Sequence, residues 1–284
     1  MSIWLEPEPL SWNLIVEDAL AEDIGYGDIT GQALANDLLV QWRIEAQADG
    51  ILCGAGIAEF ILAPYPQDPE KCTIGVERMD GDSISRGDLI LEGILPARRA
   101  LAGERTALNF LMHLSGVATT TAMYVKKVEG TDAKIIDTRK TVPGLRALQK
   151  YAVRCGGGHN HRMGLFDGAL IKDNHIAALG GVRPAIQAVR NSISHMVKIE
   201  VECETPHQVD EAIDCGAEVI LLDNMDPFMM REIVKKHKGR VLFEASGGIN
   251  LDTVRGVAQT GVDLISVGAL THSPCSLAFH MEFE

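Results

Sequence analysis

The hydrophobic and polar positions divide the chain into two halves with different periodicities. Residues Ser11 to about Ala21 predict an amphipathic surface helix with Ser11 as its N-cap. From about Val40, short strand-like runs alternate with turns such as Asp80-Gly81-Asp82, which is typical of a small β-rich domain. A second helix, predicted from Ala97 to about Met112, links this half to the next.

After about Gly116 the pattern changes to short β-branched runs, each followed by a helical segment and a glycine. Such a βα repeat predicts a parallel sheet, and its regularity favours a barrel over an open sheet. Only about six runs are plain, so a complete eightfold barrel is not expected. The predicted strands are Lys134–Thr138, Ala169–Lys172, Lys198–Glu202, Val219–Asp223, Val241–Ser246 and Leu264–Gly268.

Composition and charge exclude several classes of protein. The chain has 284 residues, 46% of them hydrophobic, which is enough for a globular core. Its net charge of −13 argues against nucleic acid or an anionic membrane as a partner. No apolar run approaches the roughly 20 residues that span a bilayer, and the start lacks the lysines of a signal peptide. Six scattered cysteines without a CxxC pair indicate reduced thiols, so we expect a cytoplasmic protein.

The predicted strands of the second half end repeatedly in polar or glycine residues. In α/β barrels the catalytic groups lie at the C-terminal ends of the strands, because the βα loops form that face. One such ending is ordinary, whereas six together indicate an active site. The endings are Thr138-Arg139-Lys140, Lys172-Asp173-Asn174-His175, Glu202, Asp223-Asn224, Ser246-Gly247-Gly248 and Gly268-Ala269.

Positive charge is concentrated between Asp137 and His175, where seven Arg or Lys residues stand against three Asp. Part of this charge falls on a predicted helix, Pro143 to Arg154, and we interpret its charged side, Arg146, Lys150 and Arg154, as an ordinary solvated face. The remaining cations flank strand ends and a glycine-rich turn, where a cation has no helix face to occupy. We predict that they bind a small anion: Arg139, Lys140, Arg162 and Lys172.

Two acids are suited to hold Mg²⁺. Glu200 and Glu202 alternate with apolar residues, and helices cover the outside of a parallel barrel, so their side chains should point into the barrel or its mouth. Glu202 with Asp223 then offers the one or two carboxylates that Mg²⁺ uses together with substrate phosphates. His159 and His161 lack a third ligand at zinc spacing, so we interpret His161 as a hydrogen-bonding partner for a carboxylate.

The last two βα turns carry small residues that let backbone N–H groups approach a ligand. Barrels often bind a phosphate at this position. A phosphate, a metal and a cationic pocket for another anion together describe a phosphorylated sugar that reacts with an acid. The turns are Ser246-Gly247-Gly248 and Ser266-Val267-Gly268-Ala269.

These residues resemble the quinolinate phosphoribosyltransferase family, and the likeness covers most of the chain. Val142 and Gln149 depart from it, since many relatives carry threonine and glutamate there. A molybdenum-transport-associated relative lacks the Lys172–His175 run, which favours the NAD-pathway enzyme. The motifs are Gly103–Phe110, Asp137–Thr141, Pro143–Arg146, Lys150–Val153, Gly156–Gly158, Asn160–Arg162, Leu170–His175, Leu221–Asn224, Ser246–Gly248 and Ser266–His272.

The resemblance implies an α/β fold in which an N-terminal α/β sandwich, residues 1–115, packs on an incomplete, about seven-stranded α/β barrel, residues 116–270. The tail, residues 271–284, would pack on the first domain. It also implies a homodimer or homohexamer with active sites shared across the interface. The family reaction joins quinolinate to phosphoribosyl pyrophosphate and releases pyrophosphate and CO₂, giving nicotinate mononucleotide for NAD biosynthesis.

The resemblance also implies a role for each site residue. Arg105 of a neighbouring subunit would help to hold the two carboxylates of quinolinate, and no organic cofactor would be needed, because the alkylated ring nitrogen is itself an electron sink. The carboxylate-binding residues of the same subunit would be Arg139, His161, Arg162 and Lys172. The pyrophosphate sugar and its Mg²⁺ would be held by Lys140, Glu202 and Asp223. The 5′-phosphate would be cradled by Ser246, Gly247, Gly248, Gly268 and the adjoining Ala269.

Two other functions fit parts of the pattern. Lys172, at the end of a barrel strand, is placed like the Schiff-base lysine of an aldolase, and borohydride trapping would detect its covalent adduct. A non-catalytic anion-binding subunit would also use the cations. It would gain nothing, however, from Glu202 and Asp223 in the same pocket.

Overall fold

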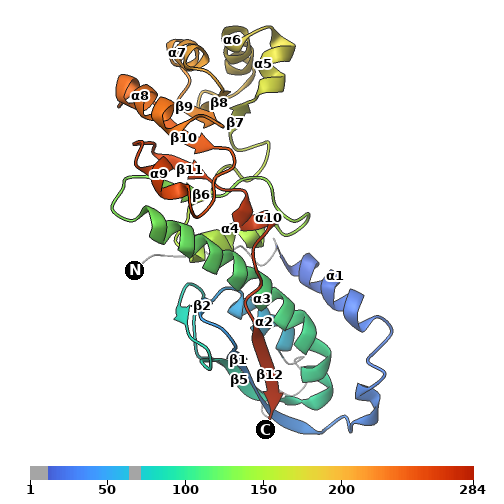
Figure 1. Cartoon of the computed structure of the whole chain (residues 1–284). Coiled ribbons are helices and arrows are strands. Elements are labelled where there is room, and N and C mark those ends of the chain that lie inside the picture. Colours follow the sequence, from blue (N-terminus) through green and yellow to red (C-terminus); the bar gives the residue numbers. More distant parts are fainter. Residues whose placement is uncertain (1–11, 64–71) are drawn as a thin grey trace. The chain divides into compact units, whose positions relative to one another are not determined.

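The computed structural model describes residues 12–63 and 72–284, and these fall into two compact units (Figure 1). The N-terminal unit contains the described residues of Met1–Ala122 together with Val142–Gly157 and Leu270–Glu284. The barrel unit contains Met123–Thr141 and Gly158–Ala269. No helix of the described residues is long and apolar enough to span a membrane.

The N-terminal unit is built on a four-stranded antiparallel sheet in the order β12-β1-β5-β3. Along β1, Trp42, Ile44 and Ala46 are buried while Arg43 and Glu45 between them are not, because successive side chains point to opposite faces of a strand. Arg43 forms ion pairs with neighbouring glutamates on that second face. The strands are β1 (Leu39–Ala46), β3 (Thr73–Val76), β5 (Leu89–Pro96) and β12 (Phe279–Phe283), with a separate pair formed by β2 (Gly50–Ile51) and β4 (Ser83–Ile84).

Helices complete this unit, and their ends differ from the predicted ones in several places. The first helix begins at Asn13, and the predicted cap Ser11 lies outside the described residues. Sequence periodicity did not indicate α2, which is short and almost entirely apolar. The helices are α1 (Asn13–Ile24), η2 (Gly31–Ala33, a 3₁₀ helix), α2 (Ala55–Leu62), α3 (Ala97–Val128), α4 (Arg146–Cys155) and α10 (Ala269–His272).

Helix α3 continues to Val128, sixteen residues past its predicted end at Met112, so that prediction was wrong. Gly116 and three consecutive threonines follow Met112 and disfavour a helix by intrinsic propensity. Packing overrides this preference: a Cβ on Gly116 would lie 2.1 Å from the carbonyl oxygen of Cys275. The glycine therefore permits a close backbone contact inside a helix that tertiary contacts stabilise.

Helix α4 begins at Arg146 rather than at Pro143, and the predicted solvated face is wrong for Lys150, which is completely buried. The neighbouring Gln149 is also buried and hydrogen-bonds to three segments of the N-terminal unit. Its side chain accepts from the Val142 backbone N–H (2.9 Å), donates to the Thr271 carbonyl (2.7 Å) and contacts His113 Nε2 (2.9 Å). These bonds explain why Val142–Gly157 groups with the N-terminal unit, although it lies within the predicted barrel range 116–270.

The barrel unit contains a six-stranded parallel sheet in the order β6-β11-β10-β9-β8-β7. All six predicted strands are present, and the predicted α/β fold class is confirmed. The described residues show no ladder that joins β6 to β7, but an isolated parallel bridge pairs Ile136 of β6 with His159. The strands are β6 (Lys134–Ile136), β7 (Ala169–Ile171), β8 (Ile199–Cys203), β9 (Val219–Asp223), β10 (Leu242–Ser246) and β11 (Leu264–Ser266).

Helices follow the strands in this unit, and local capping fixes where two of them begin (Figure 1). Thr205 and Gln208 form a capping box at the start of one helix, and Asp226 accepts two backbone N–H groups at the start of another. Both caps follow directly on strand ends, so the side chains at those ends are held by rigid elements. The helices are α5 (Asp173–Leu179), α6 (Val182–Ser192), α7 (Pro206–Asp214), α8 (Pro227–His237) and α9 (Val254–Ala258).

Candidate active site

Strand register places the polar strand ends of the barrel unit on one face of the sheet. Glu202 pairs with Leu221, which in turn pairs with Glu244, and Asp223 pairs with Ser246. Residues in register in a parallel sheet point the same way, so Glu202, Glu244 and Asp223 share a face. Ionisable groups are costly to bury without a partner, so this acidic face marks a site rather than a packing surface.

His161 lies at the centre of a cluster of five polar residues in the barrel unit. His161 Nε2 lies 2.9 Å from a Glu200 carboxylate oxygen and 3.7 Å from one of Glu244. The fully buried Asp137 accepts the His161 backbone N–H at 2.9 Å and the Asn160 amide at 2.6 Å. The loop that follows α4 therefore contacts β8 and β10 and the residue that follows β6.

The hydrogen bonds fix the protonation of His161. The backbone N–H of Arg162 donates to His161 Nδ1 at 2.6 Å, so that nitrogen carries no proton. The proton is then on Nε2, where it donates to Glu200. Both ring nitrogens of His161 are thus engaged, one by the Arg162 backbone and the other by Glu200.

The surroundings of the buried Glu244 disfavour its ionised form. Burial, the negative charge of Glu200 and a hydrogen bond to Glu200 raise the pKa of Glu244 well above its usual range, although a hydrogen bond from Ser266 opposes the shift. Oε1 of Glu200 is buried and has no hydrogen-bond partner among the described residues. The surroundings of Glu244 therefore favour its protonated form, which avoids a second negative charge beside Glu200.

Arg162 combines burial with a like-charged neighbour. Burial and the positive charge of Arg139 lower the pKa of the Arg162 guanidinium, while Glu200 and Asp167 act in the opposite direction. Its Nη1 donates to the Gly168 carbonyl at 3.0 Å, and the ion pairs of the described residues do not include it. Two guanidinium groups that repel each other attract an anion, because binding of the anion offsets their repulsion.

Two further strand ends are held in defined positions. Lys172 Nζ lies 2.8 Å from a Glu202 oxygen, and the lysine side chain is 48% exposed. The Asn224 amide donates to Asp223 at 2.8 Å, and the Asn224 backbone has a positive φ of 52°. At Gly247 a Cβ would lie 2.1 Å from Asn224 Oδ1, so only glycine fits at this turn.

Comparison with known proteins decides what this site belongs to. The model of the quinolinate phosphoribosyl transferase C-terminal domain matches residues 117–282, and that of the N-terminal domain matches residues 28–115. The chain belongs to the quinolinate phosphoribosyltransferase family. The resemblance predicted from its motifs is confirmed.

Relatives of this phosphoribosyltransferase carry a consistent name. A probable nicotinate-nucleotide pyrophosphorylase [carboxylating] of Bacillus subtilis is 44% identical over 92% of this chain and 89% of its own. The nicotinate-nucleotide pyrophosphorylase [carboxylating] of Mycobacterium leprae is 44% identical over 91% of this chain and 92% of its own. The solved nicotinate-nucleotide pyrophosphorylase from Francisella tularensis superposes with a TM-score of 0.93 at 35% identity, over 100% of both chains. The family is one of enzymes, as predicted.

The predicted site residues of this phosphoribosyltransferase-family chain lie almost entirely in the barrel unit. Arg139 and Lys140 are exposed just beyond β6, and Ser246, Gly247 and Gly248 follow β10. Gly268 and Ala269 follow β11 and end the barrel unit. Arg105 is different, because it lies on α3 in the N-terminal unit with its side chain 60% exposed.

Sequence reasoning missed three buried acids of this site. Asp137 and Glu244 were not proposed, and Glu200 was noted only as a neighbour of Glu202. The available signal was a charged residue inside an otherwise apolar or small strand run, as for Glu244 in Leu242–Ser246. A parallel strand is usually covered on both faces, so such a residue must have a partner inside the protein.

Proposed function

We propose that this chain transfers the phosphoribosyl group of phosphoribosyl pyrophosphate to quinolinate, with release of pyrophosphate and CO₂ and formation of nicotinate mononucleotide. The observation that carries the proposal is the half-buried Arg162 guanidinium, whose pKa the positive charge of Arg139 lowers, a cationic pair that a dicarboxylate would neutralise. Planar guanidinium groups bind carboxylates through two parallel hydrogen bonds, which also orients the pyridine ring. Membership of the family supports the same reaction.

Two other residues would support the Arg139 and Arg162 pair, one by fixing its position and one by adding positive charge. His161 acts through the Arg162 backbone, because both of its ring nitrogens are already bonded within the protein. Lys172 would contribute a third cation while its contact with Glu202 fixes the position of its ammonium group. Holding both reactants in line replaces a bimolecular encounter with an oriented one, which is a large part of the rate increase available to such an enzyme.

Glu202 and Asp223 fit a magnesium ion by the chemistry of their donors. Their carboxylates share one face of neighbouring strands, and Mg²⁺ is usually held by one or two carboxylates plus substrate phosphates. When bound, the ion would supply positive charge to the departing pyrophosphate. Lys140 would add a positive charge near the pyrophosphate from the exposed loop after β6. At Gly247, Gly248 and Gly268, the absence of side chains would let the 5′-phosphate approach the backbone N–H groups.

Decarboxylation then follows from the substrate itself. The ring nitrogen of quinolinate forms the new bond to the ribose carbon as pyrophosphate leaves with its bonding electrons. The nitrogen becomes cationic, the adjacent carboxylate leaves as CO₂, and its bonding pair stays on the ring carbon, which takes up a proton. No organic cofactor is required in this scheme, because the alkylated ring accepts the electron pair.

A shared active site would explain the position of Arg105. Its side chain is 60% exposed on a helix of the N-terminal unit, and Leu165 and Phe166, beside the Arg162 loop, are 74% and 83% exposed. Large exposed apolar side chains mark protein contact surfaces. We therefore include in the proposal a homodimer or a homohexamer built from dimers, in which Arg105 of one subunit completes the site of the next. We also propose a cytoplasmic location, where the six free cysteines would stay reduced.

Mixing two inactive variants tests the shared site. Arg105→Ala and Arg139→Ala subunits, dissociated and reassociated in equal amounts, would form mixed dimers in which one of two sites is intact. Random pairing places half of the subunits in such dimers, so about a quarter of the wild-type activity should return. If the mixture stays inactive although mass analysis shows mixed dimers, Arg105 does not act across an interface.

A single assay tests the reaction. Purified protein is supplied with Mg²⁺, phosphoribosyl pyrophosphate and either quinolinate or nicotinate, and CO₂, pyrophosphate and mononucleotide are measured. Turnover of quinolinate with equal amounts of the three products is expected. Binding of quinolinate without turnover would favour a non-catalytic anion-binding subunit. The aldolase alternative has less support, because Lys172 is half exposed and ion-paired rather than enclosed in an apolar pocket, and borohydride should trap no adduct on it.

A further inference from the structure

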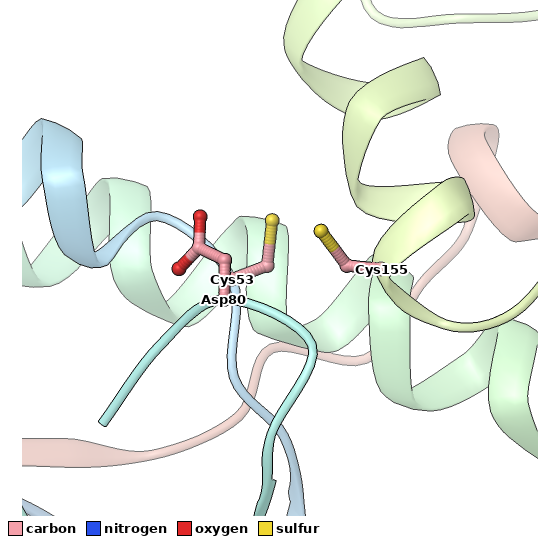
Figure 2. Close-up of side chains that lie close together, drawn as sticks. All are labelled: Cys53, Asp80 and Cys155. Carbon is pink, nitrogen blue, oxygen red and sulfur yellow. The ribbon is translucent and has the colours of Figure 1, made fainter. Parts of the chain in front are cut away.

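Two buried cysteines lie side by side in the N-terminal unit, outside the site described above. Cys53 follows β2, and Cys155 is the last residue of α4; they are 0% and 5% exposed. Their sulfur atoms and a carboxylate oxygen of Asp80 all lie within 4.8 Å of one another. Figure 2 shows the two thiol groups facing each other, with the Asp80 carboxylate beside Cys53.

The Asp80 carboxylate is already engaged as a structural group. One oxygen accepts the backbone N–H groups of Gly54 and Ala55, both at 2.9 Å, at the start of α2. The other accepts the Tyr151 hydroxyl at 3.0 Å, and burial together with the negative charge of Asp80 raises the pKa of that phenol, so it stays a donor. A metal ion would have to compete with three donors for this carboxylate, which leaves a bond between the two thiols as the chemistry that the cluster offers.

We propose that Cys53 and Cys155 form a reversible disulfide when the protein meets a peroxide or a low-molecular-weight disulfide. The thiols face each other within 4.8 Å, and a disulfide requires about 2.05 Å, so a small side-chain movement brings them together. With hydrogen peroxide, each thiol gives up its hydrogen, one S–S bond forms, and the peroxide is reduced to two water molecules. With a disulfide oxidant, two exchange steps release two small thiols.

A cavity gives small oxidants a place next to the pair. It has a volume of about 560 Å³ and is lined in part by Asp80, Tyr151 and Ala55, which adjoin the two cysteines in space or in sequence. Larger reagents would not reach sulfur atoms that are almost fully buried. The pair should therefore react with hydrogen peroxide and resist bulky thiol reagents in the folded protein.

The disulfide would be a covalent cross-link that stabilises the N-terminal unit. It would connect the start of α2 to the end of α4 and close about 100 residues of chain, and closing a long loop restricts mainly the unfolded state. Gly156, directly after Cys155, is tightly packed, since a Cβ there would lie 2.3 Å from the Ala118 carbonyl oxygen. The side chains rather than the α4 backbone would therefore adjust when the bond forms.

The test uses the full-length protein and does not depend on its activity. Reduced protein is exposed to hydrogen peroxide, remaining thiols are alkylated after unfolding, and peptides are analysed by mass spectrometry alongside thermal unfolding. We expect a peptide pair that joins Cys53 to Cys155 with the loss of two hydrogens. The melting temperature should rise by several degrees and return to its first value after treatment with dithiothreitol.

Two variants serve as controls. Cys155→Ala should lose both the linked peptide and the temperature shift, whereas Cys203→Ala, which removes an equally buried thiol in β8, should retain both. Circular dichroism of each variant checks that it folds, and Cys53→Ala provides a second loss-of-link variant. The proposal is overturned if wild-type protein yields no 53–155 peptide while the exposed Cys275 reacts. It is also overturned if reduced protein purifies with one equivalent of zinc that Cys155→Ala lacks.

Discussion

The two units each hold a cluster that contains acidic side chains, one half-buried aspartate in the N-terminal unit and two buried glutamates in the barrel unit, and the clusters differ in how well their hydrogen bonds are satisfied. Asp80 in the N-terminal unit accepts three donors on its two oxygens. In the barrel unit Glu200 and Glu244 face each other across His161, the pKa of Glu244 is raised, and one Glu200 oxygen has no partner among the described residues. Satisfied polar clusters stabilise a fold, whereas strained ones concentrate at functional sites. Substitutions in the first cluster should therefore affect stability, and those in the second should affect activity.

The largest expected effect is on activity, in the barrel unit. Arg162→Ala removes a guanidinium that would bind a substrate carboxylate, so kcat/KM for quinolinate should fall on the order of 100-fold, about 3 kcal/mol. Steady-state kinetics with quinolinate varied would measure the loss. Arg183→Ala, which removes an exposed arginine on α6, is the matched control and should change nothing. Unchanged kinetics of Arg162→Ala would contradict its place in the site.

The next effect is on stability, in the N-terminal unit. Asp80→Ala leaves two backbone N–H groups and the Tyr151 hydroxyl without their acceptor, which should lower the free energy of unfolding by about 2–3 kcal/mol. Urea denaturation would measure the loss, and kcat/KM should stay within about twofold of wild type. Asp88→Ala, which removes the exposed acceptor of the Ser85 N–H, should cost less than about 1 kcal/mol. A larger loss of activity than of stability in Asp80→Ala would contradict the comparison.

A pair of glutamine substitutions separates the two carboxylates of the barrel unit. Glu200→Gln removes the charge that accepts from His161 and should lower kcat/KM about tenfold. Glu244→Gln replaces an acid whose pKa is raised with a neutral group of the same shape and should change kcat/KM by less than about threefold. The pKa of Glu244 is higher in the folded than in the unfolded protein. The free energy of unfolding therefore falls as the pH rises through the folded pKa, because the buried carboxylate then ionises. The Glu244→Gln variant has no such group and should not show this fall. Equal effects of the two substitutions would show that the carboxylates do not differ in protonation.

The smallest expected effect is a pH dependence in the N-terminal unit. Burial lowers the pKa of His113, whose Nε2 faces the Gln149 amide at 2.9 Å and therefore acts as an acceptor. The unfolded chain binds this proton near pH 6.5, above the folded pKa, so stability is complete above that pH and falls as the pH is lowered through the folded pKa. The loss between pH 7.5 and 5.5 should be about 1 kcal/mol or less, measured by urea denaturation at each pH. His113→Gln should flatten the curve, and substitution of the exposed His195 should not.

Local sequence patterns predicted the barrel strands well because each is a short β-branched run that ends in polar or glycine residues. They failed where packing decides the outcome. Gly116 looked like a helix end but sits inside α3, where a Cβ would meet the Cys275 carbonyl. Lys150 looked like part of a solvated face but is fully buried.

The candidate site shows the same limit. Cations at strand ends are visible in the sequence, since no helix face explains them. The contact of His161 with Glu200 and Glu244 is not visible, because it depends on which strands become neighbours: β8 and β10 are separated in the sheet by β9, and the His161 loop comes from another part of the chain. Predicting that cluster would have required the strand order as well as the strands.

The pairing of β12 with β1 has a consequence for the order in which the chain is made. Trp42 of β1 pairs with Phe283 of β12. During synthesis, β1 therefore lacks its β12 partner until about 240 further residues have been added. At about 5–20 residues per second, that edge of β1 stays open for roughly 10 to 50 s in every newly made molecule. An unpaired strand edge invites association with other chains. Newly synthesised protein should therefore aggregate more readily during translation than the finished molecule does, and ribosome-bound chains that stop before Phe279 should engage chaperones that the complete chain releases.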